Sequence, residues 1–348
     1  MTIVSSAEPG AMGLSARRGF EQLGLEVSYV PYLDWQPHIS LGRLRGAGVI
    51  TRVLGGVVRP ALEARLVAEL TRARPDLVLF LKCDDLHAAT YRLVRAVTRA
   101  RLVAFHPDDP WNRWTLVRAG PAHGRAGVQM RSVDHMFLWS RPLVERAREA
   151  GVRCDYLTFA CDPVLHARVE EPSEDERRAL GSEVCFIGNW DEEREAWLGP
   201  LADAGLGLAL WGSDYWVSRC RHPGLRRAWR GRPLVGREQA VAARTSGVMV
   251  NVLRRQNKGS CNMRTFEIPC AGGFMLHERS PEAAEFFPPG IAAGGFGSPE
   301  ELVVEARRWL ADPEGRERIA AEGHRRALAW TYREWAQALL AALGGQGA

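Results

Sequence analysis

The chain lacks several features that would restrict its function at once. No apolar run reaches the roughly 18 residues that a membrane-spanning helix needs. The N-terminal residues hold no basic stretch before an apolar core, so we expect no signal peptide. The seven cysteines form no C-x-x-C pair, which argues against a zinc site or a thiol redox motif. Scattered cysteines without a secretion signal indicate reduced thiols and a cytoplasmic location.

Nucleic-acid binding is also disfavoured. The net charge of +5 is mild, and it fits an anionic substrate such as a nucleotide sugar without requiring one. Arginines concentrate in residues 43–59 and 219–232, but neither segment has the aromatic interleaving typical of a nucleic-acid-binding surface. Residues 43–59 could contact an anionic membrane surface or an acidic acceptor. An ordinary solvated basic face is favoured.

The length and patterning indicate two domains. With 348 residues, 46% hydrophobic and 25% charged, the chain resembles an ordinary globular protein that can form two cores. Alternating strand and helix patterns predict parallel α/β sheets. We expect an N-terminal Rossmann-like domain over residues 1–165 and a linker with a short helix over 166–182. A C-terminal Rossmann-like domain follows over 183–343, with a frayed tail at 344–348.

The expected strands divide between these two domains. Those of the first domain are residues 3–6, 26–31, 77–81, 102–105, 136–139 and 155–159. Those of the second are residues 184–188, 206–211, 234–236, 248–253, 274–277 and 291–293. Helical patterns include residues 62–72, 86–99 and 299 to about 343. Ligands of such sheets bind at the carboxyl ends of strands. We therefore expect five loops around one site, at residues 5–13, 106–111, 188–194, 212–216 and 257–264.

The most informative segment is residues 257–267. Ser260 is the expected N-cap of the helix that follows. A helix N-terminus suits a phosphate group, and Lys258 and Arg264 would add full positive charges. Glu267 lies one turn further in, where its carboxylate could accept hydrogen bonds from ribose hydroxyls. The segment predicts a grip for a nucleotide diphosphate; the alternative is an ordinary capped helix with a solvated charged face.

A second segment, residues 106–111, places two adjacent carboxylates between prolines after an expected strand. Asp108 or Asp109 could orient an acceptor hydroxyl or accept its proton. His106 could bond a sugar hydroxyl or offset phosphate charge. The alternative is a Pro–Asp turn with solvated carboxylates. Which carboxylate faces the ligand stays open, because side-chain directions in a loop do not follow from sequence.

Three further loops carry weaker signals. The small-residue loop 5–13 does not match G-x-G-x-x-G, so Gly10 fits a simple strand-to-helix turn as well as a ligand site. Gly188 ends a strand and allows close approach of a ligand. Arg194 follows on the next helix, where an ordinary surface position is equally expected. The segment at Gly212 could border a base pocket, although simple packing is favoured there.

These motifs resemble those of the CgeB-like (spore maturation protein) glycosyltransferases, relatives of the retaining glycosyltransferase family 4. The most specific are NMRTFEI at residues 262–268 and DDP at 108–110. Weaker matches follow in the same order along the chain: DLVL at 76–79, FACDP at 159–163, FIGN at 186–189, GGFML at 272–276, ER at 278–279, SPEEL at 298–302, residues 309–313 and TY at 331–332. The resemblance covers nearly the whole chain.

The resemblance implies the GT-B fold, with two Rossmann-like domains facing across a cleft and C-terminal helices. It also implies transfer of a sugar from a nucleotide-diphosphate donor to a hydroxyl of a protein, a polysaccharide precursor or a metabolite. No cofactor is implied. Because no metal-ligand cluster is apparent, positive side chains are expected to stabilise the leaving diphosphate. The expected nucleotide-sugar-binding residues are Gly10, Gly188, Asn189, Arg194, Gly212, Lys258, Ser260, Asn262, Arg264, Thr265 and Glu267.

One departure leaves the stereochemistry open. Family 4 enzymes typically carry a glutamate, seven residues, and a second glutamate. Glu267 fits the second position, but Gly259 occupies the first, where the carboxylate usually touches the donor sugar. The CgeB-like pattern shares this gap. The gap therefore does not argue against activity as such. Two alternatives to this transferase are kept open on other grounds: a nucleotide-sugar epimerase of the same fold, and a non-catalytic sugar-nucleotide-binding protein of envelope or spore assembly.

Overall fold

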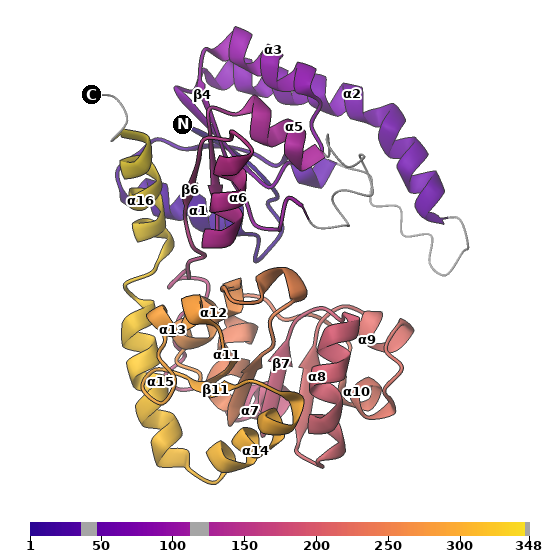
Figure 1. Cartoon of the computed structure of the whole chain (residues 1–348), viewed down its shortest axis with the longest axis vertical. Helices are drawn as coiled ribbons and strands as arrows, with labels where there is room; N and C mark the ends of the chain where they lie inside the picture. The colour runs from indigo at the N-terminus through magenta and orange to yellow at the C-terminus, as the bar shows by residue number, and fades with distance from the viewer. Residues whose placement is uncertain (36–46, 112–124, 345–348) are drawn as a thin grey trace. The chain divides into compact units, whose positions relative to one another are not determined.

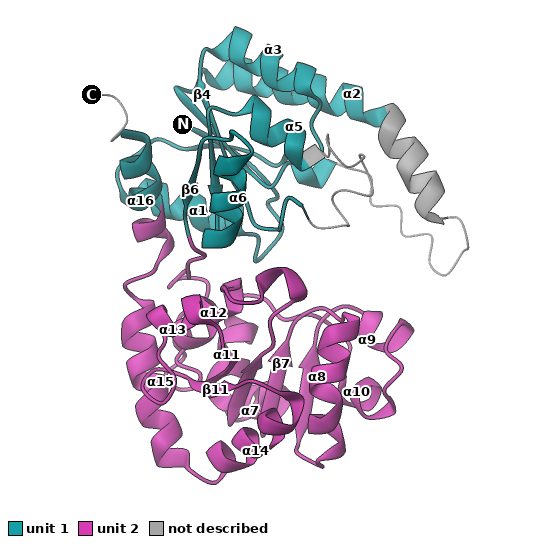
Figure 2. Cartoon of the chain, in the orientation of Figure 1, with its two compact units in different colours: residues 1–157, 336–348 teal, residues 158–335 magenta. Residues whose placement is uncertain are grey.

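The computed structural model describes residues 1–35, 47–111 and 125–344 (Figure 1). The chain divides into two compact units (Figure 2). Residues 1–157 and 336–348 form the first unit, and residues 158–335 form the second. Each unit is built on a parallel sheet with helices between the strands, which confirms the predicted α/β class.

In the first unit, the described residues contribute six parallel strands in the order β2-β1-β3-β4-β5-β6. The strands are β1 (Thr2–Val4), β2 (Ser28–Val30), β3 (Leu77–Leu81), β4 (Arg101–His106), β5 (His135–Leu138) and β6 (Cys154–Tyr156). The helices are α1 (Met12–Gln22), η1 (Tyr32–Trp35), α2 (Ala47–Ala73), α3 (Ala88–Thr98), α5 (Arg125–Ser132) and α6 (Arg141–Glu149). The central strands are continuous apolar runs because both faces of the sheet are covered.

In the second unit, five parallel strands run in the order β11-β10-β9-β7-β8 among the described residues. They are β7 (Val184–Ile187), β8 (Leu208–Trp211), β9 (Val248–Asn251), β10 (Met275–Glu278) and β11 (Gly294–Phe296). The helices before β10 are α7 (Glu174–Leu180), α8 (Glu192–Asp203), α9 (Tyr215–Ser218), α10 (Pro223–Ala228), α11 (Arg237–Thr245), η2 (Arg255–Asn257) and α12 (Met263–Cys270). The later helices are α13 (Pro281–Phe286), α14 (Pro299–Leu310) and α15 (Pro313–Ala327), followed by α16 (Tyr332–Gly344), of which only the first residues belong to this unit.

The strand order reverses direction once in each sheet. In the first unit β1 lies between β2 and β3, and in the second unit β7 lies between β8 and β9. Such a reversal opens a crevice outside the carboxyl ends of the two strands, where open α/β sheets bind their ligands. The loops after β1 and β3, and those after β7 and β9, are therefore the favoured ligand positions.

One of the expected strands does not form, and another lies a few residues further along the chain. Residues 234–236 form no strand, because Val235 is exposed and Gly236, at φ 58°, already starts helix α11. The last strand is Gly294–Phe296 rather than residues 291–293. Residues 291 and 292 lie instead in a turn, which the N–H of Gly290 closes by donating to the carbonyl oxygen of Ala293 at 2.8 Å.

The last helix changes unit. Residues 336–348 group with the first unit, although the sequence pattern assigned residues 183–343 to the second domain. The Arg101 side chain donates to the carbonyl oxygen of Leu343 at 2.8 Å, a contact between residues distant in sequence. The expected short helix in the linker is confirmed as α7, which a capping box of Ser173 and Glu176 begins.

The basic segment, the cysteines and the helices bear on what the composition predicted. Residues 43–46 of the basic segment 43–59 lie outside the described residues, and the alternative of a membrane or acceptor contact by this segment stays a prediction. All seven cysteines are buried free thiols. In the part of the chain that the structure describes, none of the helices is both long and apolar enough to cross a bilayer.

Candidate functional site

Three loops of the second unit meet at the carboxyl ends of β7 and β8. The indole of Trp216 donates to the carbonyl oxygen of Gly188 at 2.8 Å. The backbone N–H of Ser213 donates to the Asn189 side chain at 3.2 Å. From helix α12, Arg264 donates to the carbonyl oxygen of the last residue of β7 at 3.3 Å. These bonds bring together three of the five loops that the sequence placed around one site.

Gly212 allows two of these loops to approach closely. A Cβ atom built at Gly212 would lie 2.2 Å from the carbonyl oxygen of Gly188, far inside van der Waals contact. Any side chain at this position must therefore displace the loop after β7. The glycine is needed for backbone packing, whatever else it contacts.

We therefore expect Gly212→Ala to destabilise the protein by about 1–3 kcal/mol, because the clash forces a backbone shift in a packed region. Urea unfolding would measure this loss. Gly127→Ala is the matched control: its added Cβ meets only the flexible Arg131 side chain, at 3.4 Å, on a helix where alanine is favoured. A Gly212→Ala variant as stable as wild type would show that the two loops do not pack as described.

Arg194 is a buried clamp between loops. Its side chain is 8% exposed, and its two terminal nitrogens donate to the carbonyl oxygens of Asn189 at 2.9 Å and Val252 at 3.3 Å. Burial, followed by repulsion from the neighbouring Arg254, lowers the pKa of Arg194 to about 10. The sequence left a donor contact and an ordinary surface position open. The burial excludes an ordinary surface position: Arg194 holds the loop after β7 against the loop after β9, and a contact with the donor stays a prediction.

Helix α12 begins two residues later than the sequence indicated. Asn262, not Ser260, is the N-cap, and it forms a capping box with Thr265. Ser260 is buried and donates to Glu282 at 2.5 Å. The expected role of Ser260 as helix cap is therefore wrong. Gly259, just before this segment, has a φ of 80°, a left-handed conformation that favours glycine.

A buried polar network holds the start of α12. Asn251, at the end of β9, exchanges two hydrogen bonds with Asn262, at 2.8 and 3.2 Å. The hydroxyl of Thr265 faces Nε2 of His277 at 3.0 Å. Burial lowers the pKa of His277 to about 4, so this ring is neutral at pH 7. These contacts fix the helix N-terminus at the carboxyl end of β9, a position that suits an anion.

Lys258 is already paired with carboxylates. Its ammonium group contacts Glu278, lies 3.2 Å from Glu193, and sits over the Trp197 ring at 4.5 Å from the ring centre. Two carboxylates thus balance its charge in this structure. A phosphate contact by Lys258 stays a prediction that requires these pairs to rearrange.

Arg264 and Glu267 form an ion pair at the buried side of α12. The Glu267 side chain is only 3% exposed, and it also accepts a hydrogen bond from Gln239 at 3.0 Å and lies 3.8 Å from His166. Burial opposes its charge, but Arg264 and then His166 lower the pKa of the Glu267 carboxyl below its usual value. The Arg264 side chain is 26% exposed, so the arginine is the member of this ion pair that reaches solvent.

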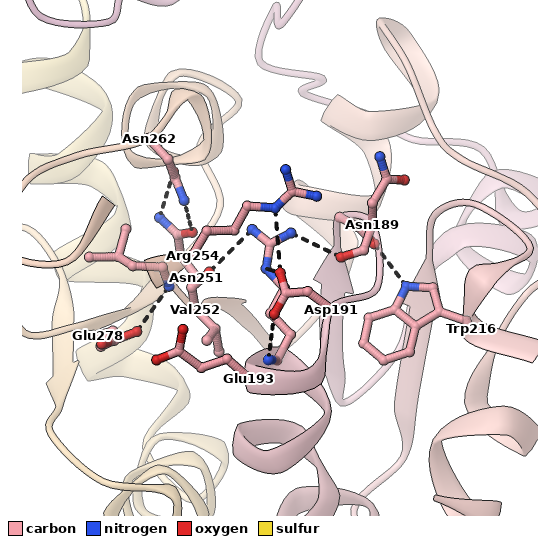
Figure 3. Close-up of polar contacts among 12 residues, drawn as sticks. Asn189, Asp191, Glu193, Trp216, Asn251, Val252, Arg254, Asn262 and Glu278 are labelled. Carbon is pink, nitrogen blue, oxygen red and sulfur yellow. Dashed lines mark hydrogen bonds and ion pairs between the residues drawn. The ribbon is translucent and has the colours of Figure 1, made fainter. Parts of the chain in front are cut away.

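Arg254 is a cation that the sequence analysis missed. It follows β9, one of the two strands at the reversal of strand order, and 41% of its side chain is exposed. Its Nε lies 3.4 Å from Asp191, and Figure 3 shows the guanidinium group reaching over that carboxylate. Its position at the carboxyl end of a predicted strand was the signal that could have identified it.

In the first unit, the two carboxylates of the acidic loop differ in their partners. Asp108 lies 3.0 Å from the ammonium group of Lys82, at the end of β3. Asp109 accepts a hydrogen bond from the backbone N–H of Trp111 at 2.8 Å, which makes it a turn residue. His106 is fully buried, and its Nδ1 faces the carbonyl oxygen of Asp108 at 2.8 Å. A direct contact of His106 with a sugar hydroxyl does not fit this burial.

The loop after β1 is held by its own polar contacts. Asp34 accepts hydrogen bonds from the Ser6 hydroxyl at 2.5 Å and the Ala7 N–H at 2.7 Å. Gly10 has a φ of 83°, and Gly13 lies so close to Tyr29 that a Cβ would meet its hydroxyl at 2.2 Å. The local backbone and packing therefore explain why both positions are glycine. A contact of Gly10 with the donor stays a prediction.

Residues 193–341 match a protein-family model described as "Glycosyl transferase-like". This segment contains helix α12, Arg254 and Arg264. No curated protein sequence matches the chain.

Solved structures match nearly the whole chain. Sucrose-phosphate synthase from Thermosynechococcus elongatus is 15% identical, with a TM-score of 0.64 over 99% of this chain and 98% of that one. Anabaena Alr3699/HepE, solved with UDP-glucose, is 12% identical, with a TM-score of 0.64 over 99% and 100%. A trehalose-phosphate synthase from Burkholderia xenovorans, solved with glucose-6-phosphate, is 13% identical, with a TM-score of 0.67 over 99% and 100%. The chain has the GT-B fold.

Proposed function

We propose that this protein is a glycosyltransferase that moves a hexose from a nucleotide-diphosphate sugar to an acceptor hydroxyl. The main support is the arrangement of Arg254 and Arg264 beside the N-terminus of α12, at the carboxyl ends of β7 and β9. Two partly exposed arginine side chains beside a helix N-terminus are suited to a diphosphate. The family match over this segment and the GT-B fold support the same assignment.

The leaving diphosphate carries most of the developing charge in such a reaction. Arg254 and Arg264 are positioned to stabilise it by preorganised hydrogen bonds, so we propose that transfer proceeds without a divalent metal ion. The acidic loop of the first unit would serve the acceptor, with Asp108 as the carboxylate that orients or deprotonates its hydroxyl. We also propose that the anomeric configuration of the transferred sugar is retained, as the family resemblance implies.

A thermal-shift panel of UDP, ADP, GDP and dTDP, with their glucose conjugates, tests donor binding first. We expect one nucleotide and its sugar to raise the melting temperature, as ligands of the native state do. Release of the nucleotide is then followed with cell extract as the source of acceptor. Tight binding with no release in any extract would favour a binding protein. Conversion of the donor sugar without acceptor would favour an epimerase.

The role of Glu267 is decided by a separate measurement. The family resemblance assigns it to the ribose, but its carboxylate is 3% exposed and contacts Arg264. We propose that its main part is to hold Arg264, and we expect Glu267→Gln to weaken ribonucleotides and 2′-deoxy analogues equally. Calorimetric titration of UDP and 2′-deoxy-UDP measures both affinities. A loss confined to the ribonucleotide would instead place the carboxylate on the ribose.

A further inference from the structure

The loop after β3 has an unusual backbone. Lys82 has a φ of 67° and Cys83 a φ of 45°, although neither is glycine. Side-chain amide and hydroxyl groups hold this conformation: Gln129 donates to the carbonyl oxygen of Lys82 at 2.5 Å, and Tyr91 donates to that of Cys83 at 3.0 Å. Two consecutive left-handed residues are costly, and such residues cluster at functional sites. This loop also follows one of the two strands at the reversal of strand order in the first unit.

The residue that this turn presents is Asp84. Its side chain is 19% exposed, and its Oδ2 lies 3.5 Å from Nε2 of His106. His106 is fully buried, its Nε2 makes no hydrogen bond, and that nitrogen is aimed at the carboxylate. The other ring nitrogen is fixed by the Asp108 carbonyl oxygen at 2.8 Å. A buried ring thus stands behind Asp84 and orients it, while the carboxylate itself reaches solvent.

The charges around Asp84 keep it ionised. Burial opposes its charge, but the His106 ring, followed by Lys82, lowers the pKa of Asp84 to about 2. Burial likewise opposes a charged ring, yet Asp84 raises the pKa of His106 above its ordinary value. A carboxylate with so low a pKa is a weak base, but it is a permanent hydrogen-bond acceptor at any ordinary pH.

We propose that Asp84 is an acceptor-binding residue that accepts a hydrogen bond from a hydroxyl of a neutral polyol, with His106 as its positioning residue. The ammonium group of Lys82 lies 3.0 Å from Asp108, so the loops after β3 and β4 offer a donor next to carboxylate acceptors. Hydroxyl groups both donate and accept, and they match such a set. The two carboxylates would repel an anionic group. This inference rests on the proposed transferase function and assigns the acceptor class.

The test compares Asp84→Asn with Asp85→Asn, a matched control whose carboxylate faces Tyr32 at 3.3 Å and Arg59 at 3.9 Å. UDP release from UDP-glucose is measured over a dilution series of cell extract, and UDP affinity by calorimetry. For Asp84→Asn we expect the half-saturating extract concentration to rise about tenfold or more, with UDP affinity within about twofold. Unchanged half-saturation in an active, folded variant overturns the inference. A wild-type protein inactive with every extract and donor removes the transferase proposal, and this inference with it.

A second measurement does not depend on turnover. Histidine-labelled protein is titrated by nuclear magnetic resonance, and His106→Gln assigns the His106 signal. We expect the pKa of His106 to fall in Asp84→Asn, because the carboxylate that favours the charged ring is gone. An unshifted titration would show that His106 does not face Asp84. In turnover, His106→Gln should shift the extract dependence in the same direction as Asp84→Asn, since its effect acts through that carboxylate.

Discussion

Arg264→Ala is expected to weaken binding of a nucleotide diphosphate and to destabilise the fold. Loss of one charge-assisted contact to phosphate costs about 1.5–3 kcal/mol, which corresponds to roughly ten- to hundredfold in Kd. The same change leaves Glu267 buried without its ion-pair partner. Removing one member of a buried pair costs about 3 kcal/mol of stability or more. Calorimetric titration and urea unfolding measure the two effects separately.

The stability loss should depend on pH. The pKa of Glu267 is lowered in the folded protein, so its contribution is fully present above the unfolded value of 4.5 and is lost as pH falls through the folded pKa. Without Arg264 the carboxyl group can protonate at a higher pH. The difference in unfolding free energy between wild type and Arg264→Ala should therefore shrink as pH falls from 7 toward 4. A difference that grows in this range would contradict the buried ion pair.

Arg254→Ala is the matched control for the two effects. Its partner, Asp191, is 32% exposed and also accepts from the N–H of Arg194, so little stability should be lost. Its affinity loss for a nucleotide diphosphate should resemble that of Arg264→Ala. Full affinity in both folded variants would remove these arginines from the donor site.

Asp108→Asn should cut sugar transfer by roughly a hundredfold or more, the usual scale of general acid–base help. The reason is that the amide keeps the shape of the side chain but cannot orient or deprotonate a hydroxyl as a carboxylate does. Donor affinity should change little, because Asp108 belongs to the first unit and the two arginines proposed to bind the diphosphate belong to the second. Initial rates of UDP release at saturating donor, with calorimetry of UDP, separate the two quantities.

Asp109→Asn is its control. The Asn side-chain oxygen can still accept the Trp111 N–H that Asp109 accepts now, so the turn should survive. Transfer should fall by less than about threefold. If Asp109→Asn is the inactive variant and Asp108→Asn is not, the assignment within the loop is reversed. If both transfer at the wild-type rate, the loop is only a turn.

The fold was largely predictable, because buried parallel strands are found in the sequence as continuous apolar runs. The strand at residues 77–81 was found with its bounds intact. The cap of α12 was not, since serine and asparagine are equally good caps and both precede the helix. A tertiary contact decides which residue caps the helix: the Ser260 hydroxyl donates to Glu282, 22 residues away, and so is not available as the cap.

The site was predictable only in part. The position of residues 188, 212 and 264 around adjacent strand ends followed from the alternating pattern. The buried role of Arg194 did not, because its carbonyl partners lie on two different loops. Asp84 was missed as well, since nothing local to its sequence reveals that a buried histidine, 22 positions later, lies behind it.

The central claim is that the protein transfers a hexose from a nucleotide diphosphate to a separate acceptor. UDP-glucose labelled with ¹³C in the sugar, or the donor selected by the thermal-shift panel, tests it most directly. After incubation with cell extract and chelator, we expect the label in a new glycosidic product in amounts equal to the nucleotide released, and roughly a hundredfold less of it in the Asp108→Asn reaction. Label that remains in the nucleotide sugar, or appears only as a second nucleotide sugar, would contradict the account.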